Sequence, residues 1–377
     1  MLRQIGRGAT AYWAFIPQPL PPELLFDVQL MGALSQADRA LGELAGVGSI
    51  FSNSVLQASP LIRREAVSSS RIEGTRTDLS TLYAYEAGQL HLPGFTSDVP
   101  ESDAREVYNY VQALEYGLER LDSLPISLRL VKELHEKLMA GVLGEQATPG
   151  AFRRTQNWIG EPNCTLNTAS FVPPPAPQMH ESLYAWELYI HADDDLPPLV
   201  RLALIHYQFE AIHPFLDGNG RIGRLLNALL LIDWKLLPVP LLYLSAYFEE
   251  HRMRYYELLT AVSQRGAWKE WILFFLQGVI HQAHDTTSRA KQLHSLQKRW
   301  QRILRQNQAT GSMIAIADLL YELPLLSAKD VTQQLNITHQ TALKTLWRLE
   351  KLNIIKEITG KERYLLFSAP DILQILV

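Results

Sequence analysis

Cysteine is nearly absent from this sequence: Cys164 is the single one among 377 residues. An intrachain disulfide is therefore impossible, and a zinc site built on a thiolate cluster is excluded. No signal peptide is recognisable, because Pro17 and Pro19 interrupt the N-terminal region before an apolar stretch develops. Together these absences lead us to expect a cytoplasmic protein.

Long hydrophobic runs are also lacking. The richest apolar stretches, residues 225–232 and 271–280, fall well short of the roughly 20 residues that a membrane-spanning helix needs. Neither sign of charge dominates, since 35 Lys and Arg oppose 39 Asp and Glu. We expect no membrane association, and the whole chain is no electrostatic nucleic-acid binder, although a basic patch can lie within it.

Helical periodicity is what the sequence has in abundance. Leu202, Ile205, Phe209 and Ile212 recur at spacings of three and four, as on the buried face of a helix. Two-residue alternation, the mark of half-buried strands, is scarce before residue 354. The pattern predicts a mainly α fold.

Residues 150–177 break this helical pattern. Two short extended stretches lie on either side of Pro162 and Asn163, and the segment ends in a run of prolines. This composition predicts a β-hairpin or flap.

The C-terminal quarter has its own organisation. Residues 286–310 carry six basic and no acidic side chains and predict an amphipathic linker helix. Residues 311–377 read as helix, turn, helix and hairpin, the order of a winged helix-turn-helix domain. Lys344, Arg348 and Lys351 on its second helix could contact DNA. However, seven basic and seven acidic residues balance in this module, so target docking or a dimer contact are alternatives.

One loop between two helices carries the chemistry. Gly218 and Gly220 allow a tight turn and close approach to a ligand. The following helix begins there, so its N-terminal N–H groups point into the loop and favour an anion, reinforced by Arg221 and Arg224. Residues 218–223 also match the dinucleotide-binding pattern G-x-G-x-x-G, but a helix precedes them where that pattern requires a strand, so we reject a Rossmann interpretation.

Two further residues of the loop suggest the reaction. Asp217 is a carboxylate among phosphate-binding groups and therefore a sensible Mg²⁺ ligand. His213 ends the preceding helix, and imidazole can accept a proton near neutral pH. Base, acid, glycines and arginines in one loop indicate phosphoryl or nucleotidyl transfer to a hydroxyl.

The stretch His213-Pro-Phe-Leu-Asp-Gly-Asn-Gly-Arg-Ile-Gly-Arg224 resembles the Fic family signature HPFx[DE]GNGRxxR at every fixed position. The resemblance implies AMP transfer from Mg·ATP, with His213 as general base and Asp217 holding Mg²⁺. It implies a nucleotide site formed by Gly218, Asn219, Gly220, Arg221, Ile222, Gly223 and Arg224.

Two other regions resemble parts of the same family. Residues 150–177, with Ile159 and Gly160, resemble the flap that aligns a target segment beside the active site by β-pairing. Tyr255 and Tyr256 resemble paired tyrosines that line an adenine pocket. Core packing is a strong alternative for both tyrosines.

A helix near the N-terminus carries an unusual end. Ser59 as N-cap, Pro60 at the first position and Gly74 after the last predict a helix over 60–73. Its final residue, Glu73, is a carboxylate at the end where the helix dipole disfavours negative charge, which calls for a cationic partner.

This helix end resembles the inhibitory motif [ST]-x-x-x-E-[GN] of Fic proteins through Ser69, Glu73 and Gly74. The resemblance implies that Glu73 pairs with Arg224 and occupies the position of the ATP γ-phosphate. ATP would then bind in a pose unsuited to in-line attack.

The resulting prediction is a Fic-type helical bundle with a hairpin flap and a winged helix-turn-helix domain. The predicted parts are an N-terminal helical segment (1–100) with an inhibitory helix (60–74), a catalytic core (101–285) with its flap (150–177), a linker helix (286–310) and a winged domain (311–377).

The resemblance implies an autoinhibited adenylyltransferase acting on a Tyr, Thr or Ser hydroxyl of a target protein or of itself, and we expect a homodimer. One alternative is a nucleotide-sensing transcriptional regulator, but the intact His213 favours an enzyme. In another, Glu73 positions a water that removes AMP from a modified residue. The loop alone leaves other nucleotide-linked donors open.

Overall fold

A computed structural model describes the chain except residues 7–10, 51–54, 89–98, 142–147, 162 and 377. Its contacts divide the chain into two compact units. The first combines Met1–Ala45 with Gln112–Ala283, and the second combines Gly46–Val111 with His284–Val377. The N-terminal segment predicted as one part therefore contributes to both units, with its inhibitory-helix region in the second.

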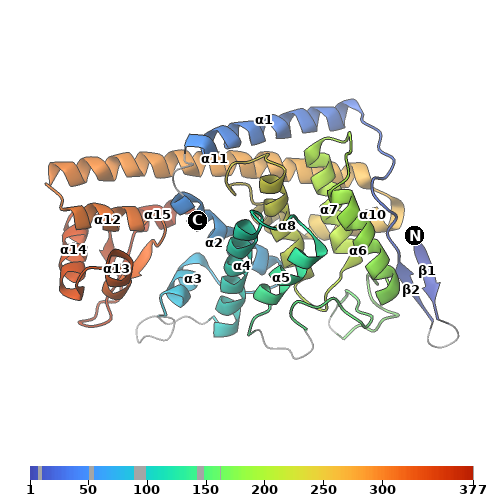
Figure 1. The fold of residues 1–377 in the computed structure, drawn as a ribbon, viewed down its shortest axis with the longest axis horizontal. Coiled ribbons are helices and arrows are strands. Elements are labelled where there is room, and N and C mark those ends of the chain that lie inside the picture. Colours follow the sequence, from blue (N-terminus) through green and yellow to red (C-terminus); the bar gives the residue numbers. More distant parts are fainter. Residues whose placement is uncertain (7–10, 51–54, 89–98, 142–147, 162, 377) are drawn as a thin grey trace. The chain divides into compact units, whose positions relative to one another are not determined.

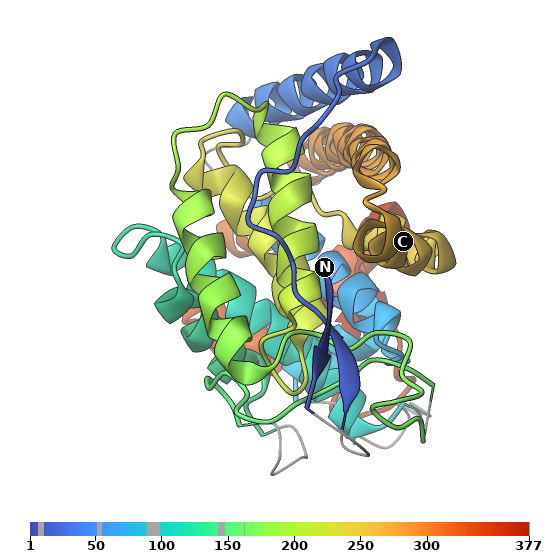
Figure 2. The same ribbon diagram turned by 90° about the vertical axis from the view of Figure 1, so that its right-hand side faces the viewer.

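The first unit is a helical bundle. Its centre is formed by α6 (Ala176–Ile190), α7 (Pro198–Ile212) and α8 (Asn219–Asp233), which lie side by side in Figures 1 and 2. Almost all residues of α7 and α8 are buried, because neighbouring helices cover them on every side. The remaining helices that contribute to it are α1 (Val28–Ile50), α4 (Glu101–Arg120), α5 (Leu128–Leu138), α9 (Ser245–Glu250), α10 (Arg252–Arg265) and α11 (Trp268–Gln306).

The first unit also contains two strands that the sequence did not predict. The strands β1 (Leu2–Ile5) and β2 (Tyr12–Phe15) pair antiparallel, with Leu2 opposite Phe15 (Figure 1). The helical segment expected over 1–100 therefore also contains a pair of strands. Strands of four residues give almost no periodic signal, and their pairing depends on contacts distant in sequence.

The second unit contains a helical part and a small sheet. Helices α2 (Val55–Ile72) and α3 (Leu79–Glu86) belong to it. Its C-terminal part follows the order α12 (Gly311–Leu319), β3 (Leu325–Ser327), α13 (Ala328–Leu335), α14 (His339–Lys351), β4 (Lys356–Glu357), β5 (Leu366–Ser368) and α15 (Pro370–Leu376). The three strands form an antiparallel sheet in the order β3-β5-β4.

Local signals in this C-terminal part were predicted well. The first helix of the predicted order of helix, turn, helix and hairpin is α13, and Ser327 and Asp330 form a reciprocal capping box at its start. Thr338 caps α14 by accepting a hydrogen bond from the Thr341 amide. Strand β3 was not predicted, because three residues carry too little pattern. A winged helix-turn-helix remains our interpretation of this order.

The basic helix predicted over 286–310 forms, but it is part of a longer helix. The basic segment is continuous with the preceding apolar residues in the single helix α11, which ends at Gln306. The chain contains neither proline nor a helix-ending glycine between these parts, so nothing interrupts the helix. Among the described residues, none of the helices is long and apolar enough to cross a membrane.

The predicted start of the inhibitory helix was also wrong. Helix α2 begins at Val55, and Pro60 lies inside it. Ser59 does not act as an N-cap: its carbonyl oxygen and hydroxyl accept hydrogen bonds from the Arg63 guanidinium instead. The predicted end is close to the observed one, since Gly74 has a positive φ of 107° directly after the last turn.

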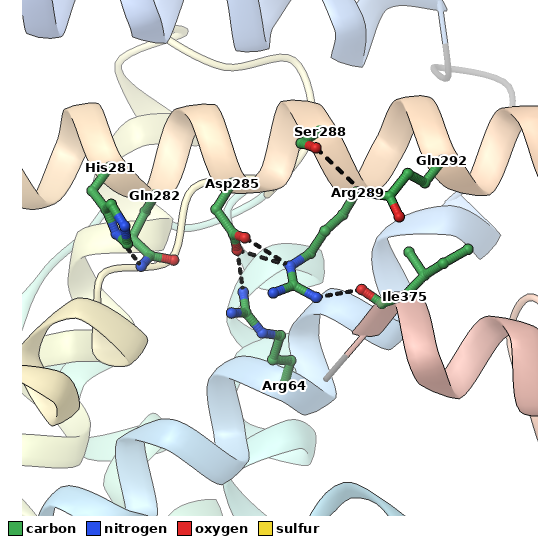
Figure 3. A network of polar contacts seen from close by, with 8 residues as sticks. All are labelled: Arg64, His281, Gln282, Asp285, Ser288, Arg289, Gln292 and Ile375. Carbon is green, nitrogen blue, oxygen red and sulfur yellow. Dashed lines mark hydrogen bonds and ion pairs between the residues drawn. The ribbon is translucent and has the colours of Figure 1, made fainter.

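An ionic network ties α2 to the helices around it in the second unit (Figure 3). The Arg64 Nη1 lies 2.8 Å from Asp285 Oδ2, and Arg289 Nε lies 2.9 Å from the same oxygen. Arg289 also donates to the carbonyl of Ile375 in α15. Burial would raise the pKa of Asp285, but the hydrogen bonds and charges of Arg289 and Arg64 outweigh it and lower that pKa.

Candidate active site

The loop between α7 and α8 depends on two left-handed residues. His213 ends α7 at φ 50° and ψ 63°, and Gly218 precedes α8 at φ 77°. A Cβ atom at Gly218 would lie 3.2 Å from both Leu138 and Met139. Conformation and space thus both require glycine at 218, as the turn signal predicted.

The loop is fastened from inside by Asn219. Its Oδ1 accepts a hydrogen bond from the Phe215 amide at 2.8 Å, and its Nδ2 donates to the Phe215 carbonyl at 2.9 Å. The Phe215 ring is fully buried and stacks on His135 with ring centroids 3.7 Å apart. Phe215 therefore anchors the loop in the core, and Asn219 has a structural task besides any contact with a nucleotide.

Arg153 joins the base of the flap to the same loop. Its buried guanidinium donates from Nε to the His213 carbonyl at 2.9 Å, from Nη1 to the Thr155 carbonyl and from Nη2 to the Pro174 carbonyl. Burial lowers the pKa of Arg153 to about 10, partly offset by Tyr12. The side chain is therefore still charged at neutral pH, and it holds three carbonyl groups in place.

His213 is half-buried, and its ring has a defined orientation. The Nδ1 atom lies 3.3 Å from the Glu210 carbonyl oxygen. Because a carbonyl only accepts hydrogen bonds, Nδ1 carries the proton and Nε2 is the basic nitrogen. The side chain therefore has the tautomer that a general base at Nε2 requires.

A second histidine near the loop was missed as a site residue. His135 accepts the Gly150 amide at Nδ1 and donates from Nε2 to the Asp217 carbonyl, each at 3.0 Å. Burial lowers the pKa of His135 to about 4, so it is neutral at pH 7 and has both nitrogens engaged. The sequence shows His135 only as one position on the apolar face of α5, because its hydrogen-bond partner Asp217 lies 82 residues away.

Asp217 presents its carboxylate to solvent, with 62% of the side chain exposed. Its Oδ1 accepts the Gly218 amide at 2.6 Å and lies 3.6 Å from Arg221 Nη2. No group of three or more metal-ligating side chains occurs within the described part of the chain. Mg²⁺ commonly takes one carboxylate together with waters and substrate phosphates, so this single exposed carboxylate fits it.

The other predicted nucleotide-binding residues follow in the first turns of α8. Arg221 and Arg224 are each at most 3% exposed, and Ile222 is fully buried. A Cβ at Gly223 would lie 2.5 Å from Glu210 Oε1 and 3.3 Å from the Phe209 ring, so glycine permits close packing of α8 on α7. Ile222 and Gly223 can therefore contribute to a ligand only through their backbone.

The flap has less regular pairing than predicted. One antiparallel bridge joins Ile159 to Phe171, with hydrogen bonds of 2.8 and 3.1 Å in the two directions. Trp158 and Ile159 are 43% and 41% exposed, and Gly160 is exposed beside them. Pro162, at the expected turn, lies outside the described residues.

The two tyrosines of the predicted adenine pocket differ. Tyr255 is buried, and its hydroxyl lies 2.9 Å from Nε2 of the buried His206, whose pKa burial lowers to about 3. Tyr256 is 39% exposed. Tyr255 thus matches the core-packing alternative, whereas Tyr256 is placed where a ligand can reach it. The adenine pocket stays a prediction.

The residues of the predicted inhibitory motif all belong to the second unit. Ser69 is fully buried in α2, Glu73 is exposed just beyond the helix, and Gly74 supplies the positive φ that ends it. The pairing of Glu73 with Arg224 stays a prediction.

Fold and site together define a helical protein with a glycine- and arginine-containing loop before a buried helix, a half-buried histidine at the start of that loop and a flap beside it. Residues 31–119 match the Fic/DOC family N-terminal model, and residues 125–231 match the Fic/DOC family model. These matches cover more than half of the chain, which belongs to the Fic/DOC family.

Curated relatives agree with this assignment. A protein adenylyltransferase Fic of Drosophila grimshawi is 27% identical over 196 residues, which is 51% of this chain and 36% of that protein. One of Culex quinquefasciatus is 29% identical over 141 residues, 37% of this chain and 25% of that protein. The matched stretch therefore spans about a third of the length of these relatives, or less.

Solved structures show the same fold. A Fic family protein from Desulfovibrio desulfuricans has a TM-score of 0.56 at 20% identity and covers 93% of this chain and 98% of its own. Fic-1 from C. elegans has a TM-score of 0.52 at 18% identity, covering 71% and 74%.

Proposed function

We propose that this protein is an adenylyltransferase that transfers AMP from Mg·ATP to a hydroxyl side chain of a target protein and of itself, and that its own α2 segment inhibits it. The observation that carries the proposal is the loop over 213–224, with its oriented histidine, two buried arginines and a solvent-facing aspartate. The curated relatives named protein adenylyltransferase Fic support the same reaction.

In the proposed reaction, the target hydroxyl approaches Nε2 of His213. The oxygen forms a bond to the α-phosphorus as the bond to pyrophosphate breaks, and the hydroxyl proton passes to Nε2. Positive charge from Arg221 and Arg224 and the N–H groups at the start of α8 stabilise the phosphates. Asp217 would hold Mg²⁺, which supplies charge neutralisation at the phosphates.

The inhibitory role assigned to Glu73 rests on its sequence motif. A carboxylate at this helix end is unfavourable with respect to the helix dipole unless a cation approaches it. Arg224 is the cation that the motif implies, and their pairing would exclude the productive position of the γ-phosphate.

Label transfer from α-labelled ATP tests the proposal. We expect weak self-labelling by wild type, much stronger labelling by Glu73→Gly, and none by Glu73→Gly combined with His213→Ala. If Glu73→Gly instead loses an activity that removes AMP from a modified protein, the reverse reaction is the function. Labelling from a different nucleotide-linked donor but not from ATP would also contradict the proposal.

A second function, binding of duplex DNA, is favoured by the charges of the C-terminal part. Lys344, Arg348 and Lys351 are exposed on α14 at spacings of four and three, so they share one helix face. The module as a whole has a net charge of zero, and several of its acids accept hydrogen bonds or form ion pairs with other groups of the protein. Asp330 caps α13, Glu350 accepts the Glu357 amide, Glu357 accepts the Gly360 amide, and Asp371 pairs with Arg299.

A mobility shift with duplex DNA at several salt concentrations tests this second function. We expect a shift at low salt that weakens steeply as salt rises, because phosphate contacts release counterions. Lys344→Gln with Arg348→Gln should abolish it, and Lys298→Gln, which removes an exposed charge on α11, is the matched control. Equal binding by the double variant and the control would contradict it.

A further inference from the structure

The N-terminal hairpin is joined to the flap through the backbone. The Phe15 amide at the end of β2 donates to the Val172 carbonyl at 2.8 Å. Phe171, the neighbour of Val172, forms the flap bridge with Ile159. Backbone contacts therefore run from β1 to β2, from β2 to Val172, and from Phe171 to Ile159.

Side chains strengthen this junction. The Phe15 and Phe171 rings lie 5.7 Å apart in a tilted arrangement, and Phe15 is 7% exposed. Tyr12 donates its hydroxyl hydrogen to Gln156 Oε1 at 3.0 Å, and Gln156 Nε2 donates to the Pro173 carbonyl at 2.9 Å. Both sides of the flap thus contact β2, one through Gln156 and Tyr12 and the other through Phe171 and Phe15.

The junction lies close in sequence to groups that fix the catalytic loop. Asn157, next to Gln156, donates from Nδ2 to the Phe215 carbonyl at 2.8 Å. Pro174, next to Pro173, accepts from Arg153, which also holds the His213 carbonyl. Hydrogen bonds therefore connect the hairpin, the flap and the loop within one compact unit.

The flap needs such support because its own pairing is sparse. Ile159 and Phe171 form a single bridge, and the neighbouring Trp158 is exposed. An isolated pair of short strands is marginally stable in water, whereas additional strands stabilise it. The edge at Ile159 is the one where an extended target segment could pair.

We propose that the N-terminal hairpin supports the flap in its function. Phe15 and Tyr12 are then positioning residues for the protein substrate but not for ATP. This inference rests on the proposed adenylyltransferase function. It predicts that loosening the hairpin weakens binding of the acceptor protein while nucleotide binding stays intact.

Kinetics in the Glu73→Gly background test this separation. The acceptor is a full-length His213→Ala chain, which cannot label itself, and the donor is α-labelled ATP. For Phe15→Ala we expect the KM for the acceptor to rise about tenfold, equivalent to about 1.4 kcal/mol, and for Tyr12→Phe about threefold. The KM for ATP should change less than twofold in both.

Trp13→Ala is the matched control. Trp13 is 59% exposed between Tyr12 and Ala14, so its removal truncates a large aromatic side chain of the same strand without touching the junction. We expect both KM values to stay within twofold. Equal effects of Trp13→Ala and Phe15→Ala, or a parallel rise of both KM values in Phe15→Ala, would overturn the proposal.

Amide hydrogen exchange tests whether the hairpin stabilises the flap, and it requires no catalytic activity. In Phe15→Ala, the amides of Ile159 and Phe171 should exchange about tenfold faster than in the parent, while the Asn219 amide region of α8 keeps its rate. Unchanged exchange at Ile159 and Phe171 would overturn the role of the hairpin. A Glu73→Gly enzyme that labels no acceptor would instead overturn the proposed function, while this exchange result still decides whether the hairpin holds the flap.

Discussion

The catalytic loop over 213–224 and the flap over 150–177 belong to the same compact unit but are stabilised in different ways. In the loop, Asn219 and Arg153 satisfy backbone groups from buried positions, and Phe215 fills the core. In the described part of the flap, one bridge carries the pairing, and Trp158 and Ile159 on one side of it are exposed. The comparison teaches that the groups expected to act on ATP are preorganised, whereas the surface expected to receive a protein has few fixed contacts.

The largest expected effect of a substitution in the loop is on the rate of AMP transfer and not on the stability of the fold. In the Glu73→Gly background, His213→Ala should lower the rate of AMP transfer by about 10²–10⁴-fold, the usual contribution of a general base. The free energy of unfolding should change little, because His213 is only half-buried. Single-turnover labelling and thermal denaturation measure the two quantities; a rate within a few-fold of the parent would exclude His213 as the base.

Arg153→Ala should show that the loop depends on buried polar contacts. It removes a guanidinium that three carbonyl groups share, and we expect a loss of about 3 kcal/mol in unfolding free energy. Chemical denaturation of the purified variant gives this value. The matched control is Arg154→Ala at the exposed neighbouring position, which should cost less than about 0.5 kcal/mol. Similar losses in both variants would contradict the account.

His135 should make the stability of the loop region depend on pH. Its pKa is lowered to about 4 in the folded protein, so the unfolded chain binds a proton first as pH falls below about 6.5. The unfolded state is then favoured, and up to about 3 kcal/mol of stability present above pH 6.5 is lost as pH falls towards 4. Denaturation at several pH values should show that the unfolding free energy of His135→Gln depends less on pH than that of the wild type. The control His180→Gln, which alters an exposed histidine, should have the pH dependence of the wild type. Equal pH dependence of His135→Gln and the wild type would contradict the lowered pKa of His135.

A small loss of stability is expected from a change in the flap. Ile159→Pro removes the N–H group that donates to the Phe171 carbonyl at 2.8 Å. Because the position is 41% exposed and paired by a single bridge, the loss of unfolding free energy should stay below about 1 kcal/mol. Calorimetry measures it. A loss as large as that of Arg153→Ala would show that the flap is as firmly built as the loop.

The sequence was most informative where a structure is determined locally. The glycine turn at 218 involves neighbours within a few residues and was found in place, and the helix end at Gly74 was found close to its predicted position. The helical class followed in the same way from periodic apolar positions. Local backbone chemistry explains why these features could be predicted.

The features that were missed depend on contacts between distant segments. The β1–β2 hairpin gains support from Val172, more than 150 residues away, and its short strands show no clear alternation. His135 acquires its role only because Asp217 reaches it across the fold. Spacing along the chain contains none of this information.

The central claim is best tested by intact-mass measurement after incubation with Mg·ATP. We compare wild type, Glu73→Gly and Glu73→Gly with His213→Ala. The account predicts that Glu73→Gly gains one or more AMP units, that wild type gains far fewer, and that the double variant gains none. Equal modification of wild type and Glu73→Gly, or modification of the double variant, would contradict it.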